Sequence, residues 1–367
     1  MNRALVFVVI ATIFFSSMEI ALKAIADSFS AMQVNITRFF LGGLALIPFA
    51  LRDLKRGTNR LTLACIGELA LLGLLGMVFS MGFYQLAVEQ APASVVAVLF
   101  CSNTAFVLLF AHLLLKNPIA RSQIQAIVLA IAGVVCIVIP FAGTLSVKAL
   151  ALSLVAPITF ALYSVLSTPI CRRHSGVVVT CATFLLGSFE LMLLLALAKL
   201  TPLGGFFAAH GLEMLTNVDL LSGYTPASFL GMLYVGIGVS GAGFACYFMA
   251  AEAASPFTAS LVFFFKPVLA PILAWIILGD HIPLSMMTGI ALIVSGSLCL
   301  LLARIRDMNL VRSFHHMHKV YHHKRWKHDY RARHFEPHLL VSIHRHDRMK
   351  ELMELLEMDR EKERADK

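Results

Sequence analysis

Ten stretches of roughly 20 mostly apolar residues follow one another along the first 303 residues of the chain, and they constrain its fold more than any other feature. Because an α-helix satisfies its backbone hydrogen bonds internally, a helical stretch of that length can cross the hydrocarbon core of a membrane. The predicted spans are residues 4–24, 31–51, 62–88, 92–115, 121–140, 147–169, 177–199, 227–251, 256–278 and 283–303. The sequence therefore predicts an all-α polytopic membrane protein with ten transmembrane helices and a C-terminal tail.

The composition argues against the main soluble classes. Hydrophobic residues make up 59% of the 367 residues and charged residues only 14%, whereas a soluble domain carries about 45–50% and about 25%. A chain this apolar has too few polar side chains to cover itself in water, which excludes a soluble enzyme, a disordered chain and a disulfide scaffold. The seven cysteines include no Cys-x-x-Cys pair, so we expect small reduced core residues rather than metal or redox ligands.

The distribution of lysine and arginine predicts the orientation of the spans, because positive residues concentrate in cytoplasmic loops. With a cytoplasmic amino terminus, the outer loops hold almost nothing basic beyond Lys148 and Lys199. The inner loops then carry Arg52, Lys55, Arg56, Arg60, Lys116, Arg121, Arg172 and Arg173. We therefore expect a multi-pass protein of the cytoplasmic (inner) membrane with both termini in the cytoplasm.

The chain also contains an internal repeat. Residues 84–137 align without a gap onto 247–300, with Tyr84 on Tyr247 and Glu89 on Glu252, and the segment that starts at Arg38 resembles the one that starts at Thr183. Chance similarity among apolar helices is the alternative. Since five is an odd number of helices, the second half would enter the membrane from the opposite side, as in the inverted-topology repeats of secondary transporters. The predicted domains are residues 1–144, 145–303 and a tail, 304–367.

Segment 256–303 carries a family resemblance. It contains Lys266-Pro267-Val268, Leu273-Ala274-Trp275, Leu278-Gly279-Asp280, Gly289 and Gly296. This run resembles the closing helix pair of the EamA domain of the drug/metabolite transporter superfamily, and the similarity extends over residues 1–303 as two tandem copies. The first copy departs from the pattern at Thr104 and at Lys116-Asn117. The resemblance implies a transporter, and it makes amino acids, related amines and metabolite efflux the leading substrate class.

Charged residues inside the predicted spans are the leading site candidates, because a charge at mid-bilayer costs at least about 2.5–3.5 kcal/mol. Glu190 lies near the middle of its span and predicts a substrate or proton site, with a structural hydrogen bond to a neighbouring helix as the alternative. Lys266 would bind a substrate carboxylate or form a static pair with Glu190 or Glu19. Glu19 is itself a substrate candidate, although Lys23, four residues on, offers it a partner on the same helix face.

Four further residues are candidates for gating. Glu89 and Glu252 lie at helix ends that the repeat relates, on opposite sides of the membrane. They would act as gates that exchange partners during transport, or simply lie at the interface. Pro267 and Pro271 interrupt the hydrogen bonding of their helix and would free carbonyl groups toward the interior of the bundle.

The tail holds ten of the fourteen histidines of the chain. His315, His318 and His322 have a helical spacing that would suit a metal ion or a response to pH. The favoured interpretation is a basic juxtamembrane helix on anionic lipid headgroups. For the same reason the net charge of +9 indicates a lipid partner rather than nucleic acid.

These observations together predict a secondary active transporter, an exporter by expectation, of a small polar metabolite such as an amino acid. Glu190, Glu19 and Lys266 would suit a zwitterion, and Tyr163 and Tyr247 would line the cavity unless they only pack. The sequence has no P-loop, Rossmann glycine pattern or Ser/His/Asp set, so we expect no enzyme activity and no cofactor. The alternative function is a membrane-anchored sensor or scaffold acting through the His-rich tail, and a homodimer is left open.

Overall fold

The computed structural model describes residues 3–57, 61–116, 121–141, 146–209, 213–216, 218–280, 282–296, 298–299 and 302. The chain divides into two compact units, one of residues 1–117 and 125–298, the other of residues 118–124 and 299–367. The predicted tail, with His315, His318 and His322, lies outside the described residues. The fold and the candidate site belong to the first unit.

Eight helical stretches of 21 to 28 residues are long and apolar enough to cross a membrane. They are Arg3–Ile25, Ala31–Arg56, Leu63–Gln90, Ala93–Leu115, Val147–His174, Gly176–Leu200, Pro226–Ala253 and Thr258–Leu278, and each coincides with a predicted span. The other two predicted spans correspond to apolar helical stretches that are shorter over the residues with described side chains, namely Arg121–Ile137, which is part of the helix Arg121–Phe141, and Leu284–Gly296. The described part of the chain contains no strand, so an all-helical polytopic membrane protein is confirmed.

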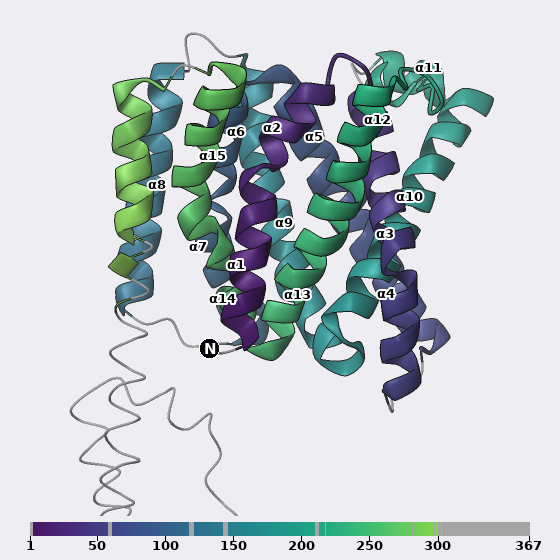
Figure 1. Ribbon diagram of the computed structural model, residues 1–367, viewed down its shortest axis with the longest axis horizontal. Helices are drawn as coiled ribbons and strands as arrows, with labels where there is room; N and C mark the ends of the chain where they lie inside the picture. Colours follow the sequence, from purple (N-terminus) through teal and green to yellow (C-terminus); the bar gives the residue numbers. More distant parts are fainter. Residues whose placement is uncertain are drawn as a thin grey trace, which may run out of the picture. The chain divides into compact units, whose positions relative to one another are not determined.

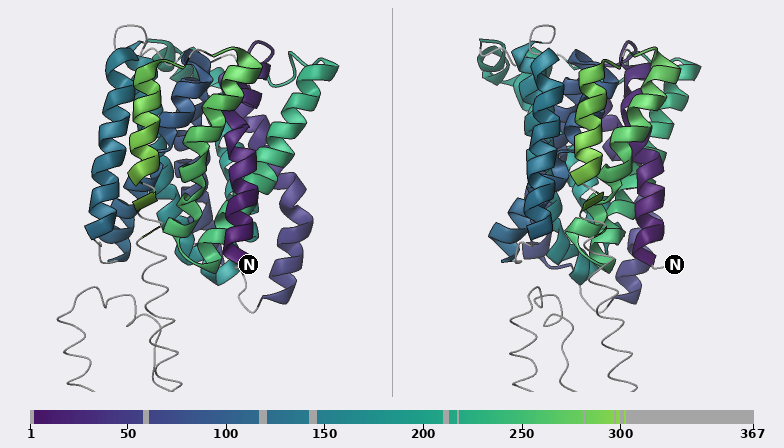
Figure 2. Two further views of the ribbon diagram at one scale, coloured as in Figure 1. Left: turned by 60° about the vertical axis from the view of Figure 1, so that its left-hand side comes forward. Right: turned by 90° about the vertical axis from the view of Figure 1, so that its left-hand side faces the viewer.

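The helices of the first unit lie side by side with roughly parallel axes (Figures 1 and 2). Three of the long stretches consist of one helix each, namely α3 (Ala31–Arg56), α9 (Val147–His174) and α10 (Gly176–Leu200). The helix α8 (Arg121–Phe141) lies against Leu284–Gly296, since a Cβ on Gly133 would lie 2.7 Å from the carbonyl oxygen of Gly289. We call the end of the bundle that carries the amino terminus the lower end and the opposite end the upper end, as in Figure 1.

Three of the long stretches are broken within the bundle. The first consists of α1 (Arg3–Ser16) and α2 (Met18–Ile25), and the fourth of α6 (Ala93–Phe100) and α7 (Asn103–Leu115). The last consists of α14 (Pro256–Ser260) and α15 (Val262–Leu278). Each break interrupts the regular hydrogen bonding of a helix, and backbone of that kind is tolerated at membrane depth only where protein or a cavity surrounds it.

Two other stretches contain a π-helical segment. In one, Leu74–Ser80 joins α4 (Leu63–Gly73) to α5 (Met81–Gln90). In the other, Tyr234–Gly243 joins α12 (Pro226–Leu233) to α13 (Phe244–Ala253). The short helices α11 (Leu203–Ala209) and Glu213–Leu215 lie between α10 and α12. π-helical turns are rare and occur frequently at functional sites, so these two segments are candidates for positions with a functional role.

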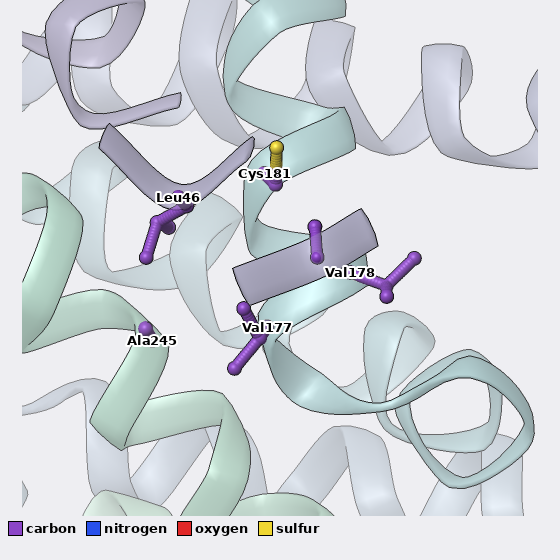
Figure 3. Packing of buried hydrophobic residues seen from close by; sticks show 6 residues of the cluster. Leu46, Val177, Val178, Cys181 and Ala245 are labelled. Carbon is purple, nitrogen blue, oxygen red and sulfur yellow. The ribbon is translucent and has the colours of Figure 1, made fainter. Parts of the chain in front are cut away.

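Apolar packing holds α3, α10 and α13 together near the lower end. Leu46 from α3, Val177, Val178 and Cys181 from α10, and Ala245 from α13 form one buried cluster (Figure 3). Many large apolar side chains are instead exposed, among them Phe49, Ile276 and Leu71, which are 58%, 66% and 69% exposed. Such a surface suits lipid acyl chains, and it agrees with the membrane assignment.

Candidate functional site

A buried ion pair lies between two of the broken stretches. The Nζ of Lys266 lies 2.5 Å from the Oε1 of Glu19, and both side chains are completely buried. Glu19 is in the first turn of α2, just beyond the break at Ser17, and Lys266 follows the break at Leu261 by little more than one turn. Two charges withdrawn from water carry a large desolvation penalty, so a pair of this kind is weak evidence for stability and indicates another role.

Aromatic rings surround the lysine. The Nζ of Lys266 lies 5.1 Å from the ring centroid of Phe100 and 5.9 Å from those of Tyr84 and Phe263. A cation in a water-poor environment is attracted by the faces of such rings. The ammonium group is therefore held by one carboxylate and three rings, contributed by α2, α5, α6 and α15.

A second cation lies beside this cluster. Arg38 of α3 is completely buried, and its guanidinium carbon lies 4.4 Å from the ring centroid of Phe39 and 5.9 Å from that of Tyr84. Its Nη2 donates a hydrogen bond to the Oδ1 of Asn35 at 3.3 Å. Tyr84 thus borders both cations, and it lies close enough to Glu19 to interact with that carboxylate as well.

The charges of this cluster do not balance. Within the described part of the chain, no ion pair joins an acid to Arg38, so two buried cations share one close carboxylate, that of Glu19. The Nε of Arg38 is buried without a hydrogen bond among the described residues. Buried polar atoms are normally hydrogen-bonded, and leaving one unpaired costs about 1–3 kcal/mol. The arrangement can therefore bind a small ligand that carries a negative group. We call Glu19, Arg38, Tyr84, Phe100 and Lys266 the central cluster.

The two predicted tyrosines lie deeper in an aromatic core. The hydroxyl of Tyr163 is 3.0 Å from the Oγ1 of Thr183, and the hydroxyl of Tyr247 is 2.8 Å from the Oγ of Ser164. The ring of Tyr247 also packs against Phe263, one of the three rings around the Nζ of Lys266, with ring centroids 6.1 Å apart. Both hydroxyl groups thus have partners, and the role of these tyrosines in substrate binding stays a prediction.

Glu190 lies apart from the ion pair. It is half-buried in α10 next to Phe189, which is 60% exposed, and its Oε2 is buried without a hydrogen bond. No ion pair involves Glu190 among the residues that the structure describes. Of the two acids considered for Lys266, the structure selects Glu19, and a pair between Lys266 and Glu190 is wrong for this conformation.

The predicted pairing of Glu19 with Lys23 is also wrong. The Nζ of Lys23 donates to the carbonyl oxygens of Val88 and Glu89, at 3.1 and 3.3 Å. These carbonyls belong to the last turn of α5, where helix carbonyls lack partners within the helix. Lys23 therefore ties α2 to the end of α5 and leaves Glu19 to Lys266.

The gating candidates lie at three places. Glu252 accepts a hydrogen bond from the backbone N–H of Gly176, whereas Glu89 is exposed and lines a pocket of about 380 Å³. Pro267 and Pro271 are buried inside α15, which continues through both of them. The break in this stretch comes earlier, at Leu261. No group of three or more potential metal ligands occurs in the described ranges.

Arg38, Tyr84 and Phe100 are the members of the central cluster that are not among the site residues proposed from the sequence. The signal for Arg38 was available, since an arginine lies well inside the span predicted for residues 31–51 and requires a reason by the same insertion cost as Glu190. Tyr84 gave no such signal, because tyrosine is common at membrane interfaces and in cores.

Comparison with known proteins shows the family of the chain. The EamA-like transporter family matches the chain twice, over residues 2–139 and 147–302. An uncharacterized transporter of Clostridium kluyveri is 33% identical over 306 residues, which cover 81% of this chain and 93% of that protein. A crystal structure described only as that of a protein has a TM-score of 0.60 at 17% identity, over 82% of this chain and 97% of the other, and it supports the fold. The chain belongs to the EamA-like transporter family, and it is a membrane transporter.

Proposed function

We propose that the protein is a secondary active transporter that exports a small zwitterionic metabolite, such as an amino acid or a related amine, and binds it at the central cluster. The observation that carries this proposal is the completely buried set of two cations and one carboxylate, formed by Arg38, Lys266 and Glu19. Intramembrane charges of this kind generally mark a substrate or ion pathway.

The chemistry of the central cluster suits a zwitterion. The substrate carboxylate would bind Arg38 and Lys266, and the substrate ammonium group would take the place of the lysine beside Glu19. The ring of Tyr84, which borders both cations, would contact either end of the ligand. The bound ligand would keep each charge of the cluster paired while it supplies the negative group that Arg38 lacks in the described structure.

Alternating access between the two halves is part of the proposal. Ten transmembrane helices, in two inverted five-helix repeats with both termini in the cytoplasm, would surround the cluster. The two family matches support a repeat. So do the π-helical segments Leu74–Ser80 and Tyr234–Gly243, which overlap when residues 84–137 are aligned with 247–300 and that alignment is extended backward. The breaks before Asn103 and Val262 fall near each other in the same alignment.

Binding to the purified protein tests the proposed substrate class. A thermal-shift screen of amino acids, amines and carboxylic acids should identify zwitterions as stabilising ligands. For the best ligand, Lys266→Met and Arg38→Met should each weaken affinity at least about tenfold, since each removes a charged partner. Lys199→Met is the matched control, because Lys199 is exposed in the last turn of α10. Unchanged affinity in both cluster variants would exclude this site.

Glu190 stays a proposed site for the substrate or for a coupling proton. Its half-buried carboxylate has an oxygen without a hydrogen-bond partner, which is compatible with proton exchange during transport. The proposal predicts that uptake into proteoliposomes depends on a pH gradient across the membrane. Uptake that is indifferent to the gradient would remove the proton role.

A further inference from the structure

The carboxylate of Glu252 caps the start of α10 at the lower end of the bundle. The Oε2 of Glu252, in the last turn of α13, accepts a hydrogen bond of 2.5 Å from the N–H of Gly176, the first residue of α10. A Cβ on Gly176 would lie 2.6 Å from the backbone nitrogen of Met249, so the start of α10 lies directly on the backbone of α13. Because a helix start has unpaired N–H groups and a positive dipole end, the carboxylate stabilises this contact.

The internal repeat places an equivalent set of residues at the upper end. Glu89 is the counterpart of Glu252, and the alignment of residues 38–49 with 183–194, extended backward, places Ala31 on Gly176 and Ser30 on Ser175. The structure agrees with this extension, since both serines are helix N-caps. The hydroxyl oxygen of each accepts a hydrogen bond of 3.3 Å from the amide three residues further on. The start of α3 therefore corresponds to the start of α10.

The contact formed by Glu252 is not formed by Glu89. Glu89 is exposed at the end of α5, and no hydrogen bond or ion pair to its carboxylate occurs among the described residues. Glu89 and Ala31 instead line the same pocket of about 380 Å³, together with Ser28, Gln33 and Asp219. At the upper end, the counterpart carboxylate and the counterpart helix start thus line one pocket, and no hydrogen bond joins them among the described residues.

A contact beside the glutamate is similar at the two ends. At the upper end, the Nζ of Lys23 donates to the carbonyl oxygen of Val88 at 3.1 Å. At the lower end, the Nη2 of Arg172 donates to the carbonyl oxygen of Ala254, also at 3.1 Å. Each end therefore has a cation bound to a carbonyl within two residues of its glutamate.

We propose that Glu252 and Glu89 cap the starts of α10 and α3 alternately, one in each state of the transport cycle. In the conformation described here, Glu252 caps α10 and the lower end is closed, while the pocket at the upper end separates Glu89 from α3. In the opposite conformation, Glu252 leaves Gly176 and Glu89 accepts a hydrogen bond from the first turn of α3. This inference rests on the proposed alternating access, and it names the hydrogen bonds that would form and break between the two states.

Amide hydrogen exchange on the full-length protein in nanodiscs tests the inference without a substrate. Glu252→Gln removes the charge of the capping carboxylate, so the amides of residues 176–178 should exchange about tenfold faster or more. The population should also shift toward the opposite conformation, and exchange at residues 31–33 should slow. Glu89→Gln should produce the reverse, with faster exchange at residues 31–33 and slower exchange at 176–178. Lys199→Gln is the control for loss of an exposed charge, because Lys199 lies in the last turn of α10, at the far end of that helix from Gly176.

Opposite changes in amide exchange at residues 176–178 and 31–33 distinguish caps that alternate from a static cap. A static cap predicts that Glu252→Gln affects residues 176–178 alone and leaves the start of α3 unchanged, and that result would overturn the inference. Because Glu89 is exposed, Glu89→Gln keeps the test valid if Glu252→Gln fails to fold. Unchanged ligand affinity in the Lys266→Met and Arg38→Met variants would contradict the proposed substrate site. Amide exchange that changes independently at the starts of α3 and α10 would instead contradict the alternating caps.

Discussion

Replacement of Lys266 by methionine should destabilise the protein strongly, since it leaves Glu19 without its counter-charge. The two side chains are 0% exposed and 2.5 Å apart, so no water replaces the lost ammonium group. Breaking a buried pair by removing one partner costs about 3–5 kcal/mol. We expect Lys266→Met to lie in that range, because methionine has a similar volume and its loss of packing is small.

The reverse replacement should cost less. Glu19→Gln leaves the ammonium group of Lys266 among the rings of Tyr84, Phe100 and Phe263, and cation–π attraction of about 0.5–2 kcal/mol per contact remains. The double variant Glu19→Gln/Lys266→Met removes both charges and should recover most of the loss. A double-mutant cycle therefore predicts a coupling energy of about 2 kcal/mol or more between the two positions.

Free energies of unfolding, measured with denaturant at one fixed detergent composition, give this cycle directly. The exposed Lys199→Met provides the baseline for loss of a lysine. A Lys266→Met variant no less stable than Lys199→Met would show that the ammonium group is not a needed counter-charge for Glu19. A double variant destabilised by the sum of the two single losses would show that the two side chains are not coupled.

Four further outcomes follow from the same structure. Gly73→Ala should lower stability by about 1–3 kcal/mol, because the new Cβ would lie 2.9 Å from a backbone nitrogen of α10; in the same helix, Gly67→Ala meets nothing within 4 Å and should be neutral or stabilising in thermal unfolding. Arg38→Lys keeps the charge but loses the planar group over two rings, so ligand affinity in a titration should fall nearly as far as in Arg38→Met. Glu190→Gln should remove the effect of a pH gradient on proteoliposome uptake. Deletion of residues 305–367 should leave transport largely intact, and loss of transport would favour a sensor or scaffold role for the tail.

The spans could be predicted from the sequence because hydropathy and length suffice to place them. The breaks at Ser17, before Asn103 and at Leu261 were not predicted. Short polar residues lie at each break (Ser16 and Ser17, Ser102 and Asn103, Ser260), but the stretches around them are apolar, and hydropathy carries no information on the path of the backbone. These breaks nevertheless position Glu19 and Lys266 in the interior of the bundle.

The central cluster could be predicted only in part. The insertion cost of intramembrane charge correctly selected Glu19 and Lys266 as buried residues, yet the choice of partner needed three-dimensional contacts. Spacing within one helix favoured Lys23 for Glu19, because sequence shows neighbours along a helix and not those across helices. Glu190 illustrates the same limit, since its position at mid-span did not reveal which neighbours it has.

Counterflow in proteoliposomes most directly tests the claim that the central cluster is the substrate site of a transporter. The purified protein should exchange a zwitterionic amino acid, identified by the binding screen, in a saturable manner across the bilayer. Lys266→Met, confirmed as folded by size-exclusion chromatography, should lose this exchange, while Lys199→Met should retain it. Full exchange by Lys266→Met, or no exchange of any zwitterion by the wild-type protein, would contradict the account.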